Sequence, residues 1–386
     1  MWLVPALRFP EFSREWKRHK LSEICSFYSG GTPSSSKKEF YNGNIPFIRS
    51  GELHKDKTEL FITEDGLNSS AAKLVEIGDL LLALYGATSG DIAISKIKGA
   101  INQAILCIRT KQNKKFIESV WNKHVERLLQ TYLQGGQGNL SADIVKNIPF
   151  YFADLEEQDK LANFISLLDE RISTQNKIIE DLKKLKSAIS KQLFAQKPNE
   201  WNRLDTLFSK GKAGGTPTST NKEYYNGEIP FLSINDITKQ GKYVRYTENH
   251  LSRSGLANSS AWVVPEYSLI MSMYASVGLV TINEIPITTS QAMFAMQLKE
   301  KDLLDYLYYY LSYFKYRHIH KYLETGTQSN INADIVRGIM IPTYGHSRNM
   351  EIASTLQRID AKIDNELAVL ELFNRQKRYL LSQMFI

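Results

Sequence analysis

The sequence predicts an α+β fold that is built twice, as two similar α/β domains joined by two long helices that pair as an antiparallel coiled coil. Three observations support this prediction. The string GGTPSSSKKEFYNGNIPF (30–47) returns as GGTPTSTNKEYYNGEIPF (214–231), with 13 of 18 positions identical. Short apolar runs bounded by Gly, Pro, Asn and Ser follow each string, which is typical of strands. Each half then closes with a long segment that carries apolar residues at heptad spacing.

The duplication continues along the whole chain, because further pairs of strings recur in the same order. These pairs are LNSSA (67–71) with ANSSA (257–261), NQAIL (102–106) with SQAMF (290–294), GNLSADIVKNIP (138–149) with SNINADIVRGIMIP (329–342), and KQLF (191–194) with SQMF (382–385). The offset grows from 184 to 191 residues, so the second copy has about seven extra residues, which we expect in loops. A period this long indicates a duplicated domain rather than a solenoid.

The repeat sets the predicted order of domains. Residues 1–152 and 198–345 form the two globular domains, and residues 153–197 and 346–386 form the two long helices. Each long helix follows its globular domain directly in the chain.

Each globular domain begins with strands and continues with a helix. In the first copy the apolar runs 45–50, 79–85 and 104–110 are predicted to be buried strands. A helix is expected over 116–134 in the first copy, directly before Gly135, and over 303–323 in the second, three residues before Gly326.

The long segments carry the a/d pattern of a coiled-coil seam. Apolar residues alternate steps of four and three, with Gln175 and Glu366 as polar members at equivalent places. The predicted seam consists of Leu161, Ile165, Leu168, Ile172, Ile179 and Leu182 in the first copy, and Ile352, Leu356, Ile359, Ile363, Leu370 and Phe373 in the second. A helix must bury its apolar stripe, so we expect the two helices to pair, antiparallel if the halves are related by a pseudo-two-fold axis. Alternatively, each helix packs on its own globular domain or on a partner.

Composition restricts the classes of function. Lys and Arg number 48 and Asp and Glu 41, which gives a net charge of +7 and a pI near 9.0. This basic balance permits a polyanionic partner without establishing one. Cys25 and Cys107 are the two cysteines, which excludes a disulfide scaffold and argues against a thiolate zinc site. No apolar run approaches the length of a membrane span, and we expect a cytoplasmic protein.

The loops that differ between the copies suit nucleic acid. They carry Lys and Arg, which neutralise phosphates, and Asn, Gln and Ser, which contact base edges. The candidate DNA-binding residues of the first copy are Thr32, Lys37, Lys38, Arg49, Ser50, Lys55, Tyr85, Thr88, Ser89, Gln137 and Asn139. Those of the second copy are Thr216, Asn221, Lys222, Ser233, Asn235, Lys239, Tyr274, Ser276, Gln328 and Asn330. Solvated surface charge is the competing interpretation for any single residue.

The sequence lacks the motifs of catalysis and of metal binding. It contains no GxGxxG, Walker A or HExxH motif, and no Asp/Asn-Pro-Pro-aromatic string of the kind that amino-methyltransferases use. His318 and His320 have no Cys or carboxylate ligand near them in the sequence, so we expect no metal site there. We therefore expect a non-catalytic chain without a cofactor of its own.

The ordered strings resemble the specificity subunit of type I restriction–modification systems over nearly the whole chain. The resemblance rests on LRFPEFSREW (7–16), the GGTP strings, the SADIV and NADIV segments, and the endings KQLF and SQMF. It implies two target recognition domains that each read half of a bipartite double-stranded DNA target, and paired helices that set the unread gap. It also implies two modification (methyltransferase) subunits and restriction (translocase and nuclease) subunits as partners, which bring S-adenosylmethionine, ATP and Mg²⁺ for adenine methylation and cleavage.

Two other functions stay open on the residues alone. One is a non-catalytic protein-binding adaptor with a coiled-coil stalk, against which the net charge and the Lys-bearing loops weigh only mildly. The other is a self-contained nuclease or methyltransferase, which the sequence does not favour because the motifs for that chemistry are missing. Salt-dependent DNA binding separates the adaptor from a specificity subunit.

Overall fold

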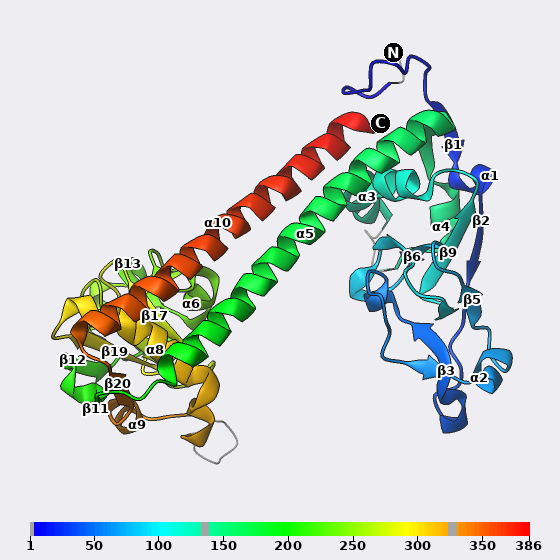
Figure 1. Cartoon of the computed structure of the whole chain (residues 1–386). Coiled ribbons are helices and arrows are strands. Elements are labelled where there is room, and N and C mark those ends of the chain that lie inside the picture. Colours follow the sequence, from blue (N-terminus) through cyan, green and yellow to red (C-terminus); the bar gives the residue numbers. More distant parts are fainter. Residues whose placement is uncertain (1–3, 133–138, 323–329) are drawn as a thin grey trace. The chain divides into compact units, whose positions relative to one another are not determined.

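The computed structural model describes residues 4–132, 139–322 and 330–386, and the chain divides into two compact units. Unit 1 consists of Met1–Lys177 and Ala368–Ile386, and unit 2 of Ile178–Leu367. Both divisions fall inside a long helix, α5 (Leu155–Phe194) or α10 (His346–Met384), so each unit contains part of both helices (Figure 1). The four predicted domain ranges stay a prediction.

Unit 1 pairs its described strands in the orders β2-β9-β6-β7, β4-β3-β8-β5 and β1-β10. The strands are β1 (Lys17–Lys20), β2 (Cys25–Ser29), β3 (Tyr41–Ile48), β4 (Phe61–Ile62), β5 (Lys73–Val75), β6 (Leu80–Ala83), β7 (Ile92–Ile94), β8 (Gly99–Ile101), β9 (Ile105–Thr110) and β10 (Pro149–Phe152). The helices are α1 (Leu21–Ile24), α2 (Glu64–Asn68), α3 (Lys114–Tyr132) and α4 (Ala142–Asn147), with single 3-10 turns η1 (Lys38–Phe40), η2 (Ser50–Glu52) and η3 (Gly86–Thr88).

Unit 2 has a similar topology, with the orders β12-β19-β16-β17-β14, β15-β13-β18 and β11-β20. Among the described residues β14 extends one sheet, and only an isolated bridge, Val264 with Ile287, stands where unit 1 has β5. The strands are β11 (Glu200–Arg203), β12 (Phe208–Ala213), β13 (Tyr225–Leu232), β14 (Tyr243–Val244), β15 (Asn249–Leu251), β16 (Leu269–Ser272), β17 (Val280–Asn283), β18 (Thr288–Thr289), β19 (Met293–Leu298) and β20 (Met340–Thr343). The helices are α6 (Ile234–Gln240), α7 (Arg253–Ala257), α8 (Leu304–Arg317) and α9 (Ala333–Arg337), with 3-10 turns η4 (Leu204–Thr206), η5 (Lys222–Tyr224), η6 (Lys301–Leu303) and η7 (Ile319–Lys321).

Each unit buries an aromatic core between its sheet and its helices. In unit 1, Trp16 and Phe116 pack against Phe385, which follows the end of α10. In unit 2, Tyr306 and its neighbours on α8 pack against Phe194 at the end of α5. Phe194 and Phe385 close the repeated strings KQLF and SQMF, so each string ends a long helix on the same kind of core contact. The α+β fold class is confirmed.

In unit 1 the segments of α5 and α10 lie side by side and run in opposite directions (Figure 1). Asp169 on α5 forms an ion pair of 2.5 Å with Lys377 on α10, and one of 2.6 Å with Lys115 on α3. Two residues further along α5, the Arg171 guanidinium lies 4.9 Å from the ring centre of Phe373, which is earlier on α10. As residue numbers rise along α5, the contacting residues of α10 have falling numbers, as antiparallel pairing requires.

Unit 2 repeats this arrangement with the roles of the helices exchanged. Asp360 on α10 pairs with Lys186 on α5 at 2.5 Å and accepts a hydrogen bond of 2.8 Å from the Tyr309 hydroxyl on α8. Every predicted seam residue is buried or half-buried, whereas Leu167 and Leu372 outside the pattern are 64% and 61% exposed. Antiparallel pairing of the helices is confirmed within each unit.

Two expectations about local structure were wrong. The segment between β3 and Phe61 holds 12 residues (49–60), and its counterpart in unit 2 holds 17 (233–249). The longer segment of unit 2 forms α6 and the edge strand β14, not only a loop, because Ile237 and Val244 are buried in a small apolar core. The helix expected over 303–323 ends at Arg317, since the chain leaves helical geometry at His318 before the turn η7.

The shared GGTP string has a framework role in both units. A Cβ on Gly30 would lie 1.7 Å from the carbonyl oxygen of Ile101, and one on Gly214 would lie 1.9 Å from that of Thr289. Only glycine permits this approach to the end of β8 or β18. The Tyr41 hydroxyl then donates to the carbonyl oxygen of Pro33 at 2.6 Å, and Tyr225 makes the equivalent bond.

The buried carboxylate of Glu52 forms hydrogen bonds with both ends of the segment that follows β3. Glu52 is 3% exposed and accepts hydrogen bonds from the backbone N–H groups of Arg49 (3.2 Å) and Glu59 (3.5 Å). The Thr58 hydroxyl (2.9 Å) and the Arg49 guanidinium (2.9 Å) also donate to it. Burial alone would raise the pKa of Glu52, but the hydrogen bonds from Arg49 and Thr58 outweigh it and lower the pKa to about 2.

Asp236 takes the same place after β13 in unit 2. It is fully buried and accepts hydrogen bonds from the backbone N–H groups of Ser233 (2.8 Å) and Glu248 (3.0 Å). The Ser233 hydroxyl in turn accepts from the Asp236 N–H at 3.2 Å, which completes a capping box at the start of α6. In both units, therefore, a buried carboxylate joins the two ends of a segment, although the two segments differ in length and sequence.

Replacing Gly30 with alanine tests the close approach of the GGTP string. Because the Ile101 carbonyl must shift, Gly30→Ala should destabilise the protein by about 1–3 kcal/mol. Gly51→Ala is the matched control, since an added Cβ there meets nothing within 4 Å. Thermal unfolding followed by circular dichroism measures both variants. Equal losses of Tm in the two variants would contradict the packing argument.

Replacing Glu52 with glutamine tests the buried carboxylate. Its folded pKa lies below the ordinary 4.5, so the carboxylate stabilises the protein above about pH 4.5 and loses this effect as the pH falls towards about 2. We expect Glu52→Gln to lose about 1–3 kcal/mol of stability at pH 7 and to show a shallower decline of Tm below pH 4.5.

Glu59→Gln is the control for the Glu52 experiment. Glu59 also pairs with Arg49, but its side chain is 78% exposed, so a near-native Tm profile is expected. If Tm falls with pH in parallel in the wild type and in Glu52→Gln, the Glu52 carboxylate does not contribute to stability.

Candidate nucleic-acid interface

The predicted loops of unit 1 begin at one edge of the sheet, around the turn at residues 102–104. The backbone N–H of Gly30 donates to the carbonyl of Asn102 at 3.2 Å, which places the GGTP loop there. Ile48 at the end of β3 pairs with Ile101, so Arg49 starts beside the same turn. The N–H of Leu84, just before Tyr85, donates to Ala104 at 2.8 Å, and the N–H of Leu140, just after Asn139, donates to Leu84 at 2.9 Å. We call these loops the Gln103 cluster.

Unit 2 assembles its loops around residues 290–292 in the same way. Gly215 donates to Thr289 at 2.9 Å, and Leu232 at the end of β13 pairs with Thr289. The N–H of Met273 donates to Ala292 at 2.7 Å, and that of Ile331 donates to Met273 at 3.0 Å. We call these loops the Gln291 cluster. Segments that are far apart in the sequence are therefore neighbours in each unit.

Most candidate residues of unit 1 present their side chains to solvent. Those that are exposed are Thr32, Lys37, Lys38, Arg49, Lys55, Tyr85 and Asn139, and those that are half-buried are Ser50, Thr88 and Ser89. The Ser89 hydroxyl donates to the carbonyl of Leu84 at 3.0 Å, which gives it a role within the loop. Lys37 and Lys38 lie at η1, and no hydrogen bond or ion pair of the described residues joins them to the turn at 102–104. Gln137 lies outside the described residues.

The candidates of unit 2 divide between exposed side chains and helix caps. Thr216, Lys222, Asn235, Lys239, Tyr274 and Ser276 are exposed, whereas Asn221, Ser233 and Asn330 are half-buried. The side chains of Asn221 and Ser233 cap η5 and α6, which occupies their oxygen atoms. Gln328 lies outside the described residues. Ala275 and Ser276 have φ of +35° and +54°, so the loop after Tyr274 holds a conformation that is common at binding sites.

The cations of the clusters are oriented by acidic partners. In unit 1 Glu59 binds the guanidinium of Arg49 at 3.0 Å, and Arg49 stays 47% exposed. In unit 2 Glu248 binds the Asn235 amide at 3.0 Å and also pairs with Lys239. Glu59 and Glu248 occupy equivalent positions. The backbone N–H of Glu59 donates to Glu52, and that of Glu248 donates to Asp236. Arg49, Asn235 and Lys239 are therefore held in a defined orientation before a ligand binds.

One histidine of unit 1 adds a charge that depends on pH. The Nε2 atom of His54 lies 2.9 Å from Oδ1 of Asp91. A hydrogen bond to this carboxylate raises the pKa of His54, against the smaller effect of burial. His54 therefore keeps its positive charge to a higher pH than a free histidine does.

Sequence reasoning missed Gln103 and Gln291, the exposed residues at the tips of the two turns. The Thr32 hydroxyl donates to Oε1 of Gln103 at 2.8 Å, and the Thr216 hydroxyl donates to Oε1 of Gln291 at 2.6 Å. The signal was present, since Gln-Ala is common to the repeated strings NQAIL and SQAMF.

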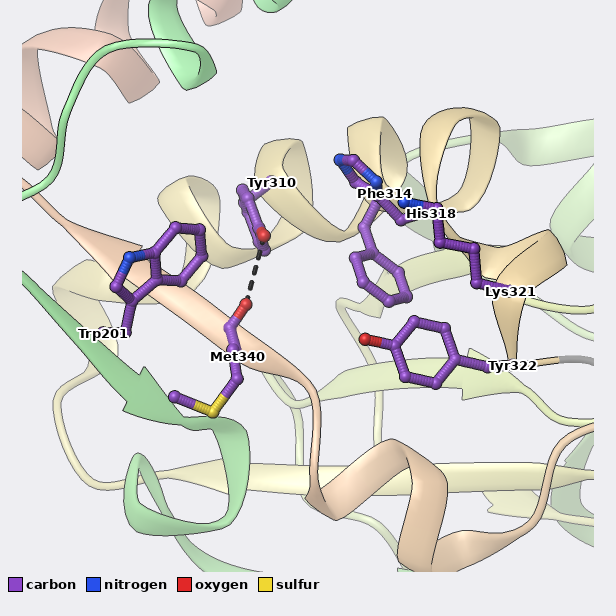
Figure 2. A pocket seen from close by; sticks show the side chains of 7 residues that line it. All are labelled: Trp201, Tyr310, Phe314, His318, Lys321, Tyr322 and Met340. Carbon is purple, nitrogen blue, oxygen red and sulfur yellow. Dashed lines mark hydrogen bonds between the residues drawn. The ribbon is translucent and has the colours of Figure 1, made fainter.

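A hollow of about 350 Å³ opens in unit 2, lined by none of the candidate residues (Figure 2). Its walls are formed by Trp201, Tyr310, Phe314, His318, Lys321, Tyr322 and Met340. The Tyr310 hydroxyl donates to the carbonyl of Met340 at 3.1 Å. In unit 1 a hollow of about 610 Å³ lies at the equivalent place, between α3 and β10. These hollows repeat with the framework and not with the loops.

Within the described ranges, Glu300, Asp302 and His346 come close enough together to share an ion. All three are exposed, and His346 already pairs with Asp302 at 3.3 Å, so the group resembles an ordinary surface ion pair. Of the helices that the structure describes, none combines the length and the apolar character that a membrane span requires.

Known proteins share both the sequence pattern and the fold. The family model of the type I restriction modification DNA specificity domain matches residues 13–184 and again residues 198–372. The putative type I restriction enzyme MjaX specificity subunit of Methanocaldococcus jannaschii is 24% identical over an alignment of 405 positions, which covers 96% of this chain and 93% of the relative. The MjaVIII specificity subunit of the same organism is 25% identical over 253 residues, 63% of this chain and 53% of the relative. The chain spans about half the length of several curated relatives that it matches.

Two solved structures share the fold along the whole chain. The S subunit of a type I restriction–modification system from M. genitalium has a TM-score of 0.59 at 15% identity, over 99% of both chains. A chain from a structure of complex assembly and conformational transition of the type I R-M system has a TM-score of 0.62 at 16% identity, over 96% of this chain and 97% of that chain. Because the family model accounts for both halves, this chain belongs to the type I restriction–modification DNA specificity domain family and carries two copies of that domain.

Proposed function

We propose that the chain is the DNA sequence-specificity subunit of a type I restriction–modification complex, in which each cluster reads one half of a bipartite double-stranded DNA target. The observation that carries the proposal is one framework that holds unlike loops at the same sheet edge in both units. Arg49 stands in unit 1 where Ser233 stands in unit 2, and the five added residues of unit 2 enlarge that segment. Unlike loops on a common scaffold are what two different half-sites require.

The chemistry of the clusters supports DNA as the ligand. Exposed lysines such as Lys38 and Lys222 can neutralise phosphates, which supplies affinity without sequence information. Arg49 and Asn235 carry N–H groups that suit guanine and adenine edges in the major groove, where one well-placed pair discriminates by about 1–3 kcal/mol. Their orientation by Glu59 and Glu248 reduces the entropy that would be lost on binding.

The two long helices would set the distance between the half-sites and hold the partner subunits. Half-sites read from one face of B-DNA lie roughly 34–36 Å apart, or a multiple of this. The faces outside the seam carry exposed apolar residues, such as Leu167 and Leu372 in unit 1 and Leu185 in unit 2, which suit docking of modification subunits. We place adenine methylation, S-adenosylmethionine, ATP and Mg²⁺ in the modification and restriction subunits, with this chain non-catalytic and cytoplasmic.

Mapping of DNA methylation tests the function. We expect a complex of this chain with its methyltransferase subunit to co-purify and to modify adenines in a motif of two specified parts separated by an unspecified gap. Sequencing that detects modified bases in cells expressing the complex gives the motif. A contiguous motif, or a complex without salt-dependent DNA binding, would contradict the proposal; the latter would favour a protein-binding adaptor.

Lengthening both helices tests their role as a spacer. Seven residues would be inserted between Lys177 and Ile178 and seven between Leu367 and Ala368, where the two units divide. One heptad keeps the seam in phase and adds about 10 Å to each helix, or about three base pairs of B-DNA. The unspecified gap in the mapped motif should change in length, with both half-sites unchanged.

A second design inserts about one heptad into α5 (Leu155–Phe194) alone, and it should also shift the gap and leave both half-sites unchanged. Altered bases within either half-site, after insertion into both helices, would show that the helices do more than set a distance.

A further inference from the structure

Both units build one exposed polar pair from the same residue types. Thr32 and Gln103 form it in unit 1, and Thr216 and Gln291 form it in unit 2, with all four side chains exposed. The pair joins two segments that are about 70 residues apart, at the centre of each loop cluster. The pair is common to both clusters, as are the Gly-Gly-Thr-Pro string and the tyrosines Tyr85 and Tyr274, whereas the segments after β3 and β13 differ.

The framework holds each glutamine at the tip of its turn. In unit 1 the side chain of Asn102 accepts the N–H of Ala104 at 3.0 Å. In unit 2 the hydroxyl of Ser290 accepts the N–H of Ala292 at 3.3 Å. Two different side chains thus shape the same turn, and Gln103 or Gln291 projects from it in each unit.

The hydrogen-bond pattern leaves donors facing solvent. Each threonine hydroxyl donates to Oε1 of the glutamine, which fixes the amide with its Nε2 hydrogens directed away from that bond. Neither Nε2 group donates to another residue in the described part of the chain. A fixed pair of N–H donors is complementary to a group that only accepts, such as a phosphate oxygen.

A polar pair that is common to both clusters suits a feature that the two halves of the ligand share. The two half-sites differ in bases but share the phosphate backbone. An exposed hydrogen bond between Thr and Gln adds little to folding stability, so the framework does not require it.

We propose that Gln103 and Gln291, held by Thr32 and Thr216, each donate to a phosphate of the DNA backbone and set the register of the neighbouring loops on the bases. This inference rests on the proposed function. It assigns to these residues a contact that is independent of sequence, beside loops that read sequence.

The test uses the complex with its methyltransferase subunit and fluorescent duplexes with and without the mapped motif. Gln103→Ala and Gln291→Ala should each weaken binding of both duplexes by a similar factor of about 2–12. The methylation motif and the Tm should stay unchanged. Because the contact is neutral, the slope of affinity against salt concentration should also stay unchanged, whereas Lys38→Ala should reduce it.

Gln130→Ala is the matched control, since Gln130 is an exposed glutamine on α3 outside the cluster, and its affinity should equal that of wild type. Unchanged affinity for Gln103→Ala and Gln291→Ala would overturn the inference alone. A changed base in one half-site would also overturn it, because that result means base reading. Failure of the wild-type complex to bind either duplex would instead overturn the proposed function.

Discussion

The close approach of a glycine backbone to the end of a buried strand is the constraint on which the rest of each unit depends. Gly30 lies against the carbonyl of Ile101, and Gly214 against that of Thr289, at distances that no side chain permits. This approach brings the GGTP loop to the turn at Gln103 or Gln291, where the loops after β3 and β6, or β13 and β16, also begin.

The pairing of the long helices is tied to the globular part by one acidic residue in each unit. Asp169 joins α5 to Lys377 of α10 and to Lys115 of α3, and Asp360 joins α10 to Lys186 of α5. Burial would raise the pKa of Asp169, but its two lysines outweigh that effect and lower it, so the carboxylate stays charged. These ion pairs add to the apolar contacts, in which Leu161 and Ile165 of α5, and Ile352 and Leu356 of α10, are buried in the cores of the two units.

The sequence contained the duplication, the strands and the seam, because each depends on a local or periodic pattern of apolar residues. Helix α6 was not foreseen, since seven residues do not form a stable helix alone and Ile237 reaches its core only in the folded sheet. The orientation of Arg49 by Glu59, and the bond between Thr32 and Gln103, join residues whose proximity depends on tertiary structure. The spacing of residues in the sequence does not predict such contacts. The loops could therefore be identified from the sequence, but their arrangement around a turn could not.

The buried carboxylates also bear on how this protein can evolve. Glu52 and Asp236 each accept a backbone hydrogen bond from both ends of a segment, which holds 11 residues (49–59) in one unit and 16 (233–248) in the other. Exposed residues between those bonds, such as Lys55 and Lys57, can be exchanged while the underlying sheet keeps its packing, whereas Leu53 and Ile237 belong to the buried cores. Substitutions confined to the exposed part of this interval can therefore accumulate in one unit at a time and leave the rest of that unit unaltered.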